Sequence, residues 1–151
     1  MTQRLVLPSA ADTEAFGARL ARALPADAAG AMVTLKGDLG AGKTALARAF
    51  LSALGHTGPV PSPTYTLVEP YEVLRYPVYH IDLYRVASGD ELEFLGWDDL
   101  RRGLVLIEWP ERAPELTANA DLAIELAYRD AGREATVRTH GDLGARWAGN
   151  L

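Results

Sequence analysis

Apolar residues recur along this chain at two spacings, and these spacings predict helices and strands. Phe16, Leu20 and Leu24 are each four residues apart and therefore share one face of a predicted helix. Residues 104–107 instead form an unbroken apolar run, Leu-Val-Leu-Ile, which is typical of a strand buried on both faces. Residues 121–128 alternate between apolar and polar side chains, which indicates a strand with one buried face.

Across the whole chain, these patterns predict strands and helices that alternate. The predicted strands are 4–7, 31–35, 64–69, 73–83, 104–107, 121–128 and 133–139. The predicted helices are 10–24 and 44–54, with shorter helical turns within 88–102, 110–113 and 141–151. The alternation favours an α/β fold, a three-layer sandwich around a central sheet. Two predicted hairpins, the third strand with the fourth and the last two strands, make this sheet mixed.

Length and composition fit one soluble globular domain, to which we assign residues 1–151. The chain is 48% hydrophobic and 23% charged, which is ordinary for such a protein. Apolar runs stay well short of the about 18 residues of a membrane span, and the N-terminus has no signal-peptide segment. The absence of cysteine excludes disulfides and thiol catalysis and fits a cytoplasmic protein.

The formal net charge of −5 bears on nucleic-acid binding. Neutralisation of phosphates supplies most of the nonspecific affinity for nucleic acid, so an acidic domain is expected to bind nucleic acid weakly on its own. A local basic patch remains compatible with the sequence, from Arg101, Arg102, Arg133 and Arg138. If RNA is involved, we expect a partner protein to hold it.

Residues 37–44 read Gly-Asp-Leu-Gly-Ala-Gly-Lys-Thr and match the phosphate-binding P-loop, G-x-x-x-x-G-K-[ST]. They lie between a predicted strand and a predicted helix, which is the context that this chemistry requires. Glycines let backbone N–H groups turn towards an anion, and the helix N-terminus adds its positive dipole end. Lys43 can reach the β- and γ-phosphates, and the Thr44 hydroxyl can ligate Mg²⁺.

Nucleotide hydrolysis also needs an acid that holds the metal. The apolar strand 104–107 ends in Glu108, and ligands of such sheets gather at the carboxyl ends of strands. Glu108 is therefore our candidate for the second protein contact to Mg²⁺, direct or through water. The alternative is a solvated carboxylate at a strand end, which the apolar run before it disfavours.

A second polar cluster, His80, Asp82 and Tyr84, alternates along a predicted strand and would share one of its faces. Asp82 is a candidate to orient the attacking water or to hold the water shell of the metal. The alternative is a structural hydrogen bond that ties the strand to a loop. His80 is more often structural than catalytic in such a setting.

Two further residues are candidates for contact with a nucleotide. Thr64 follows the P-loop helix and could meet the γ-phosphate and Mg²⁺ as a switch loop does, although a plain loop fits equally well. Trp109 follows Glu108 and could cover the nucleotide, face a partner or pack in the core. The guanine-reading signature N-K-x-D is absent, which favours ATP over GTP.

Four motifs, taken together in their order and spacing, resemble the TsaE family, also called YjeE. They are Gly37–Thr44, Ser62–Tyr65, His80–Arg85 and Ile107–Glu111. The resemblance extends over roughly residues 9–140. It departs at Tyr65, where many members have Phe, and either ring could serve as a packing anchor.

The resemblance implies a P-loop NTPase-like α/β fold and a Mg²⁺-dependent ATPase that is weak alone. Its implied partner is the TsaB–TsaD pair, and tRNA is contacted indirectly through these partners. The implied assembly places a threonylcarbamoyl group on the tRNA adenosine that is 3′-adjacent to the anticodon. The ATPase is implied to reset the complex rather than to transfer the group.

Carried over position by position, the resemblance also implies roles for residues. Thr44 and Glu108 would ligate Mg²⁺, and Asp82 and Thr64 would act in hydrolysis together with Lys43. The residues that would contact ATP are Thr13 on its adenosine side, Arg133 from the final hairpin, Trp109, and Asp38, Leu39, Gly40, Ala41, Gly42, Lys43 and Thr44 around its phosphates.

Two other functions remain open on the sequence. One is a small-molecule P-loop kinase, although such enzymes usually have an Arg-rich lid, and Arg101 and Arg102 are only a pair. The other is a nucleotide-sensing module that binds ATP without turnover.

Overall fold

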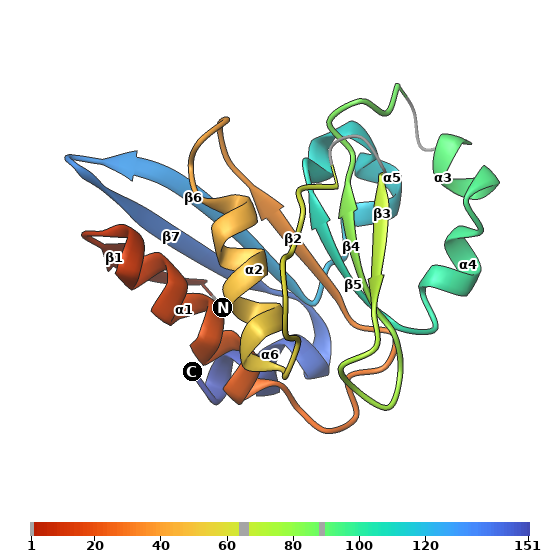
Figure 1. The fold of residues 1–151 in the computed structure, drawn as a ribbon, viewed down its shortest axis with the longest axis horizontal. Helices are drawn as coiled ribbons and strands as arrows, with labels where there is room; N and C mark the ends of the chain where they lie inside the picture. Colours follow the sequence, from red (N-terminus) through yellow and green to blue (C-terminus); the bar gives the residue numbers. More distant parts are fainter. Residues whose placement is uncertain (1, 64–66, 88–89) are drawn as a thin grey trace.

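A seven-stranded sheet organises the chain, of which the computed structural model describes residues 2–63, 67–87 and 90–151 (Figure 1). The order of strands across the sheet is β1-β7-β6-β2-β5-β4-β3. The strands are β1 (Thr2–Leu7), β2 (Met32–Lys36), β3 (Val68–Tyr71), β4 (Val78–Asp82), β5 (Leu104–Glu108), β6 (Leu122–Arg129) and β7 (Gly132–Thr139).

The centre of this sheet is parallel and its edges are antiparallel. Strand β2 pairs in parallel with β5 and β6, and β4 pairs in parallel with β5. The hairpin pairs β3–β4 and β6–β7 and the edge pair β1–β7 are antiparallel. The predicted mixed sheet of an α/β fold is therefore confirmed.

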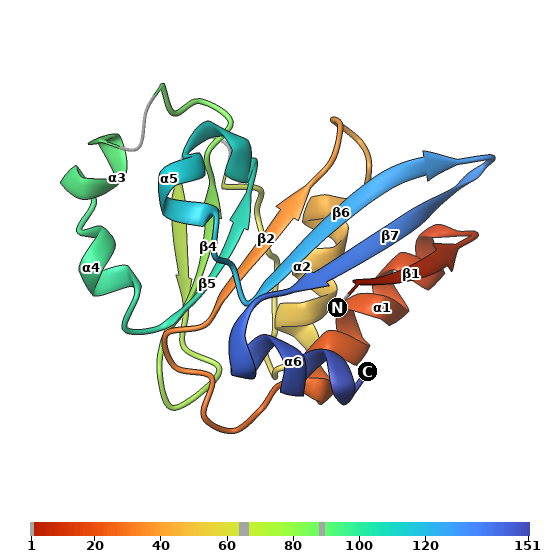
Figure 2. The same ribbon diagram turned by 180° about the vertical axis from the view of Figure 1, so that it is seen from behind.

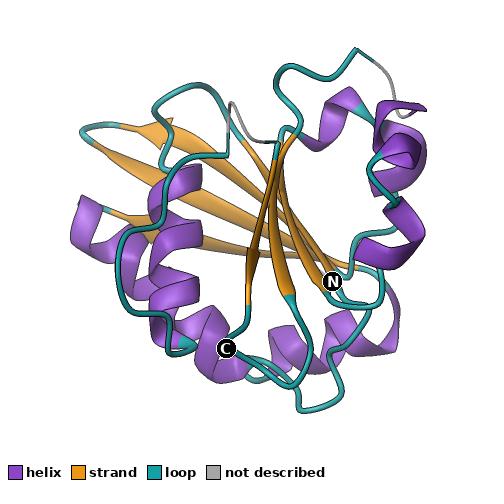
Figure 3. Cartoon of the chain, turned by 45° about the vertical axis from the view of Figure 1, so that its right-hand side comes forward, coloured by secondary structure: helices purple, strands orange, loops and turns teal. Residues whose placement is uncertain are grey.

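Helices lie on both faces of the sheet (Figures 1, 2 and 3). On one face lie α1 (Ala10–Ala23), α2 (Lys43–Ala53) and α6 (Gly141–Gly149). On the other face lie α3 (Asp90–Phe94), α4 (Trp97–Leu100), the 3₁₀ turn η1 (Pro110–Arg112) and α5 (Pro114–Thr117). Within the described residues, none of these helices has the length and apolar character needed to cross a membrane.

Strand β5 shows how the two layers are formed. Leu104 and Leu106 belong to the core cluster that also contains residues of α1, α2 and α6, whereas Val105 and Ile107 belong to the second core cluster on the opposite face. Successive strand residues point to opposite faces, so an unbroken apolar run is what a doubly covered strand requires. The prediction of a strand buried on both faces at 104–107 is confirmed.

The parallel register brings three strand ends to one place. Glu108, the last residue of β5, pairs with Leu35 of β2 and with Asp82 of β4. The P-loop leaves the end of β2, so it emerges beside both acids. Sheet register, rather than proximity in sequence, therefore assembles the candidate site.

Strand β4 is shorter than predicted, because its pairing starts after Pro77 and ends at Asp82. A proline has no N–H for a strand ladder and commonly marks such a boundary. After Asp82 the chain turns, and the Tyr84 N–H donates to Asp82 Oδ1 at 2.8 Å. The expectation that Tyr84 shares a strand face with His80 and Asp82 is therefore wrong. Strand β3 begins at Val68, and residues 64–66 of its predicted range lie outside the described residues.

Helix α1 begins as predicted and lies unusually close to α2. Ser9 and Asp12 form a capping box, in which each side chain accepts a hydrogen bond from the other's backbone N–H. A Cβ placed on Gly17 would lie 2.6 Å from Leu46 O and 2.9 Å from Ala49 Cβ. Only a glycine at this position allows the two helices to approach so closely.

We therefore expect Gly17→Ala to destabilise the protein. Alanine is favoured in a helix by about 1 kcal/mol, but overpacking against backbone typically costs about 1–3 kcal/mol. The free energy of unfolding in urea, followed by circular dichroism, should fall by about 1–2 kcal/mol. Gly149→Ala in α6 is the matched control, because a Cβ there meets nothing within 4 Å. Equal effects of the two substitutions would contradict the close-packing explanation.

Candidate functional site

The P-loop adopts a conformation that depends on two of its glycines. Gly40 and Gly42 have φ of +79° and +106°, in the left-handed region that residues with a Cβ rarely adopt. Gly42 is also the N-cap of α2, which begins at Lys43. The first N–H groups of a helix have no partner within it, so this loop ends in a set of donors suited to an anion.

Lys43 is buried within the loop, with only 5% of its surface exposed. Its Nζ donates to Gly37 O at 2.5 Å and to Asp38 O at 2.9 Å. Burial lowers the pKa of Lys43, and nearby carboxylates, Glu108 foremost, partly oppose this effect. The ammonium is thus held at the loop by carbonyl oxygens that a phosphate oxygen can replace.

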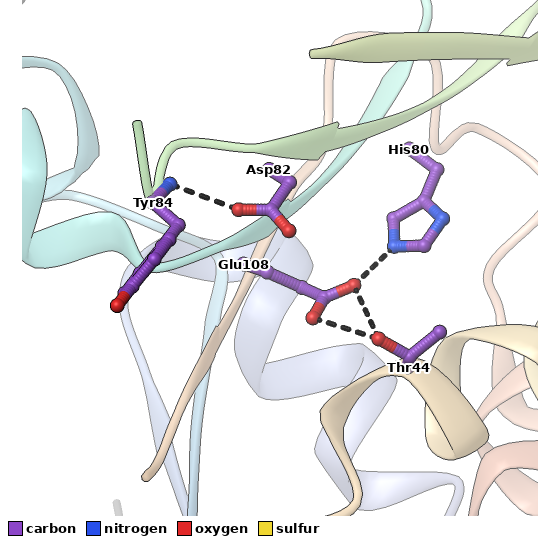
Figure 4. A network of polar contacts seen from close by, with 5 residues as sticks. All are labelled: Thr44, His80, Asp82, Tyr84 and Glu108. Carbon is purple, nitrogen blue, oxygen red and sulfur yellow. Dashed lines mark hydrogen bonds and ion pairs between the residues drawn. The ribbon is translucent and has the colours of Figure 1, made fainter. Parts of the chain in front are cut away.

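The Thr44 hydroxyl and the Glu108 carboxylate face each other across the end of the sheet (Figure 4). Thr44 Oγ1 donates to Glu108 Oε1 at 3.1 Å and to Oε2 at 3.3 Å. Glu108 is 2% exposed, and its Oε2 also lies 2.5 Å from Nε2 of the fully buried His80. Glu108 is therefore not the solvated carboxylate of the alternative interpretation.

The Thr44 and Glu108 oxygens fit a magnesium ion by chemistry and by spacing. Mg²⁺ prefers hard oxygen ligands at about 2.1 Å in an octahedron, which sets neighbouring ligands about 3 Å apart. Thr44 Oγ1 and Glu108 Oε1 are joined here by a direct hydrogen bond of 3.1 Å, a separation that a shared ion would also allow. A hydroxyl and a carboxylate beside a P-loop are the donor types that such an ion takes.

Asp82 lies beside this pair and is 4% exposed. It shares with the P-loop a cavity of about 300 Å³. The residues that line this cavity are Leu39, Gly40, Gly42, Lys43, Thr44, Ala45, Ser62, Asp82, Tyr84, Glu108 and Trp109. The structure thus brings together most of the predicted phosphate, metal and hydrolysis residues. Asp38 and Ala41 of the P-loop do not line this cavity, and Thr64 lies outside the described residues.

Trp109 forms one wall of this cavity. Its φ of +60° turns the chain sharply after Glu108, and its ring lies 4.3 Å from Lys43 Nζ. The Tyr84 ring packs against it, with centroids 4.9 Å apart. Trp109 is half-buried and also packs against the second core cluster, so it combines a place at the cavity with a place in the core.

A second cavity, of about 340 Å³, lies on the other side of the P-loop and shares Gly40, Gly42 and Ala45 with the first. Thr13 from α1 and Arg133 from β7 both line it. The family resemblance implied Thr13 for the adenosine side of a nucleotide and Arg133 for a further contact from the final hairpin. The fold therefore brings Thr13 and Arg133 next to the P-loop, although both are distant from it in the sequence.

Arg133 contacts the loop itself. Its guanidinium donates to Gly40 O at 3.0 Å and to Ala41 O at 3.1 Å. Tyr128, which sequence reasoning missed, lies 4.1 Å beneath the same guanidinium and donates its hydroxyl to Leu39 O at 3.2 Å. No local pattern marks Tyr128, because it is 89 residues from its partner.

Comparisons with known proteins agree with this geometry. The family model described as "Threonylcarbamoyl adenosine biosynthesis protein TsaE" matches residues 7–138. The tRNA threonylcarbamoyladenosine biosynthesis protein TsaE of Haemophilus influenzae is 45% identical over 115 residues, which cover 75% of this chain and 73% of that one. Its counterpart from Streptomyces coelicolor is 40% identical over 139 residues, or 88% and 92% of the two chains.

The fold is also similar to that of a solved structure. The crystal structure of Bacillus subtilis YdiB superposes with a TM-score of 0.74 and 29% sequence identity, over 99% of this chain and 91% of that one. The sequence matches extend well beyond the P-loop to most of the chain. The resemblance noted from the four motifs is thereby confirmed, and the chain belongs to the TsaE family of threonylcarbamoyl adenosine biosynthesis proteins.

Proposed function

We propose that this protein is a Mg²⁺-dependent ATPase that works with a TsaB–TsaD pair in the threonylcarbamoylation of tRNA. In this role it resets or regulates the complex that modifies the adenosine 3′-adjacent to the anticodon. It does not itself transfer the threonylcarbamoyl group. The observation that carries the proposal is the meeting of the P-loop Thr44 with the buried Glu108 at 3.1 Å. Phosphate binding alone would not require a buried carboxylate such as Glu108 beside Thr44.

The residues of the first cavity have distinct parts in this function. Thr44 and Glu108 would hold Mg²⁺, which when bound neutralises charge on the β- and γ-phosphate oxygens. Lys43 would exchange its carbonyl partners for phosphate oxygens, to which it forms stronger charge-assisted hydrogen bonds. Asp82 would orient the attacking water, and its position in the lining of the same cavity supports this role.

The surface charge supports contact with tRNA through partners. The net charge is −5, and the four arginines named above for a local basic patch all have partners within the protein. Arg102 and Arg138 pair with carboxylates. Arg101 and Arg133 donate to backbone carbonyls. The net negative charge, more than these largely exposed contacts, is what disfavours direct binding to phosphates of nucleic acid.

Removal of the P-loop ammonium should weaken nucleotide binding. We expect Lys43→Ala to lower MgATP affinity by about 10–100-fold, because charged hydrogen bonds contribute about 1.5–3 kcal/mol. Titration calorimetry measures this directly. Lys36→Ala is the control, because Lys36 is the other lysine of the chain and is exposed at the end of β2. Wild-type affinity in Lys43→Ala would contradict the phosphate site.

Glu108→Gln separates metal binding from nucleotide binding. The amide keeps the shape of the side chain but loses the charge that holds Mg²⁺. We expect Mg²⁺-dependent ATP hydrolysis to fall by about 100-fold or more, since metal stabilisation contributes several kcal/mol. ADP affinity measured in EDTA should stay nearly unchanged. Glu111→Gln, an exposed acid three residues on, serves as the control. Equal losses of hydrolysis and metal-free binding would instead indicate a folding role.

The partner requirement is tested by phosphate release with and without a purified TsaB–TsaD pair. We expect slow hydrolysis alone, a clear increase with the pair, and co-purification that differs between ATP and ADP. Lys43→Ala in the same mixture controls for contaminating ATPases. Background hydrolysis under both conditions would indicate a nucleotide-sensing module, and phosphoryl transfer to a small metabolite without the pair would indicate a kinase.

A further inference from the structure

His80 is a fully buried polar residue that the proposed reaction does not itself use. It lies on β4, one strand away from Glu108, and no part of its surface is exposed. Its Nε2 lies 2.5 Å from Glu108 Oε2 (Figure 4). Within the described part of the chain, its Nδ1 has no hydrogen-bond partner. Glu108 is thus the hydrogen-bond partner that accounts for the orientation of the ring.

The two carboxylate oxygens of Glu108 differ in their hydrogen bonds. Oε2 accepts from His80 Nε2, and the shorter of the two bonds from Thr44 Oγ1 goes to Oε1. A glutamate has several rotatable bonds, and a hydrogen bond to one oxygen fixes where the other lies. Nε2 is assigned as the donor, because the ionised Glu108 carboxylate oxygen that it faces can only accept a hydrogen bond.

The strand pairing explains why His80 reaches the carboxylate. His80 pairs with Leu106 and Asp82 pairs with Glu108 in the parallel register of β4 and β5. His80 and Glu108 are therefore diagonal neighbours on one face of the sheet, the face that α2 covers. A shorter polar side chain at position 80 would end before Oε2.

We propose that His80 is a positioning residue for the metal: its Nε2–H holds Glu108 Oε2 so that Oε1 stays directed at the ion shared with Thr44. This proposal rests on the proposed role of Glu108 as a metal ligand. Partners of this kind behind metal ligands commonly change metal affinity by about 10–100-fold when they are removed. The rival explanation is that His80 only fills space between β4 and α2.

The test measures Mn²⁺ affinity by electron paramagnetic resonance in the full chain saturated with ADP. His80→Gln keeps an N–H donor near the position of Nε2, whereas His80→Asn is equally polar but one methylene shorter. We expect His80→Asn to weaken Mn²⁺ binding by about 10–100-fold and His80→Gln to stay within a few-fold of wild type. ADP affinity in EDTA should be equal in all three proteins.

Leu106→Val controls for simple loss of packing, because Leu106 pairs with His80 and is equally buried. This variant should lose thermal stability but keep its Mn²⁺ affinity. Wild-type Mn²⁺ affinity in His80→Asn, or equal losses in His80→Asn and Leu106→Val, would overturn the proposal. If His80→Asn does not fold, a loss of Mn²⁺ affinity in folded His80→Gln as large as that in Glu108→Gln would overturn it.

Failure of the underlying metal site has a different signature. If Glu108→Gln binds Mn²⁺ as tightly as wild type, then Glu108 is not a metal ligand and both proposals fail together. If Glu108→Gln loses the metal while His80→Asn retains it, the metal site stands and only the role of His80 is overturned.

Discussion

The candidate site depends on one buried carboxylate, that of Glu108. A carboxylate removed from water is stable only if hydrogen bonds or opposite charges replace its hydration. Glu108 receives such bonds from Thr44 at the start of α2 and from His80 on β4. The P-loop helix and the strand beside β5 are therefore tied to the same two oxygen atoms. Neither can shift without leaving a buried acid poorly paired.

The phosphate loop is supported from within and from outside. Inside it, Lys43 satisfies the carbonyls of Gly37 and Asp38. Outside it, Tyr128 and Arg133 of the β6–β7 hairpin satisfy carbonyls at the tip of the loop. Loop carbonyls have no strand or helix partner, and buried or half-buried ones need such donors. The two supports together hold a loop whose glycines would otherwise leave it many conformations.

Local patterns were sufficient for the parts of the site that are local in sequence. The strand, loop and helix around residues 37–44 and the acid at the end of 104–107 follow from apolar runs and one motif. The contact of His80 with Glu108 could not be predicted in this way, because it depends on the register between β4 and β5. The place of Tyr84 was missed because a turn, fixed by the Asp82 side chain, ends the strand early. The roles of these residues in hydrolysis stay predictions.

The hairpin support has a consequence for how the phosphate-binding signature can be used. All eight residues of the motif lie within the first third of the chain, which suggests that the motif could be transferred to another protein by itself. Its carbonyls, however, bond to side chains 89 to 93 residues further on, and β2 is flanked by β5 and β6. An excised fragment or a graft of residues 31–54 would carry the signature without the scaffold that shapes it.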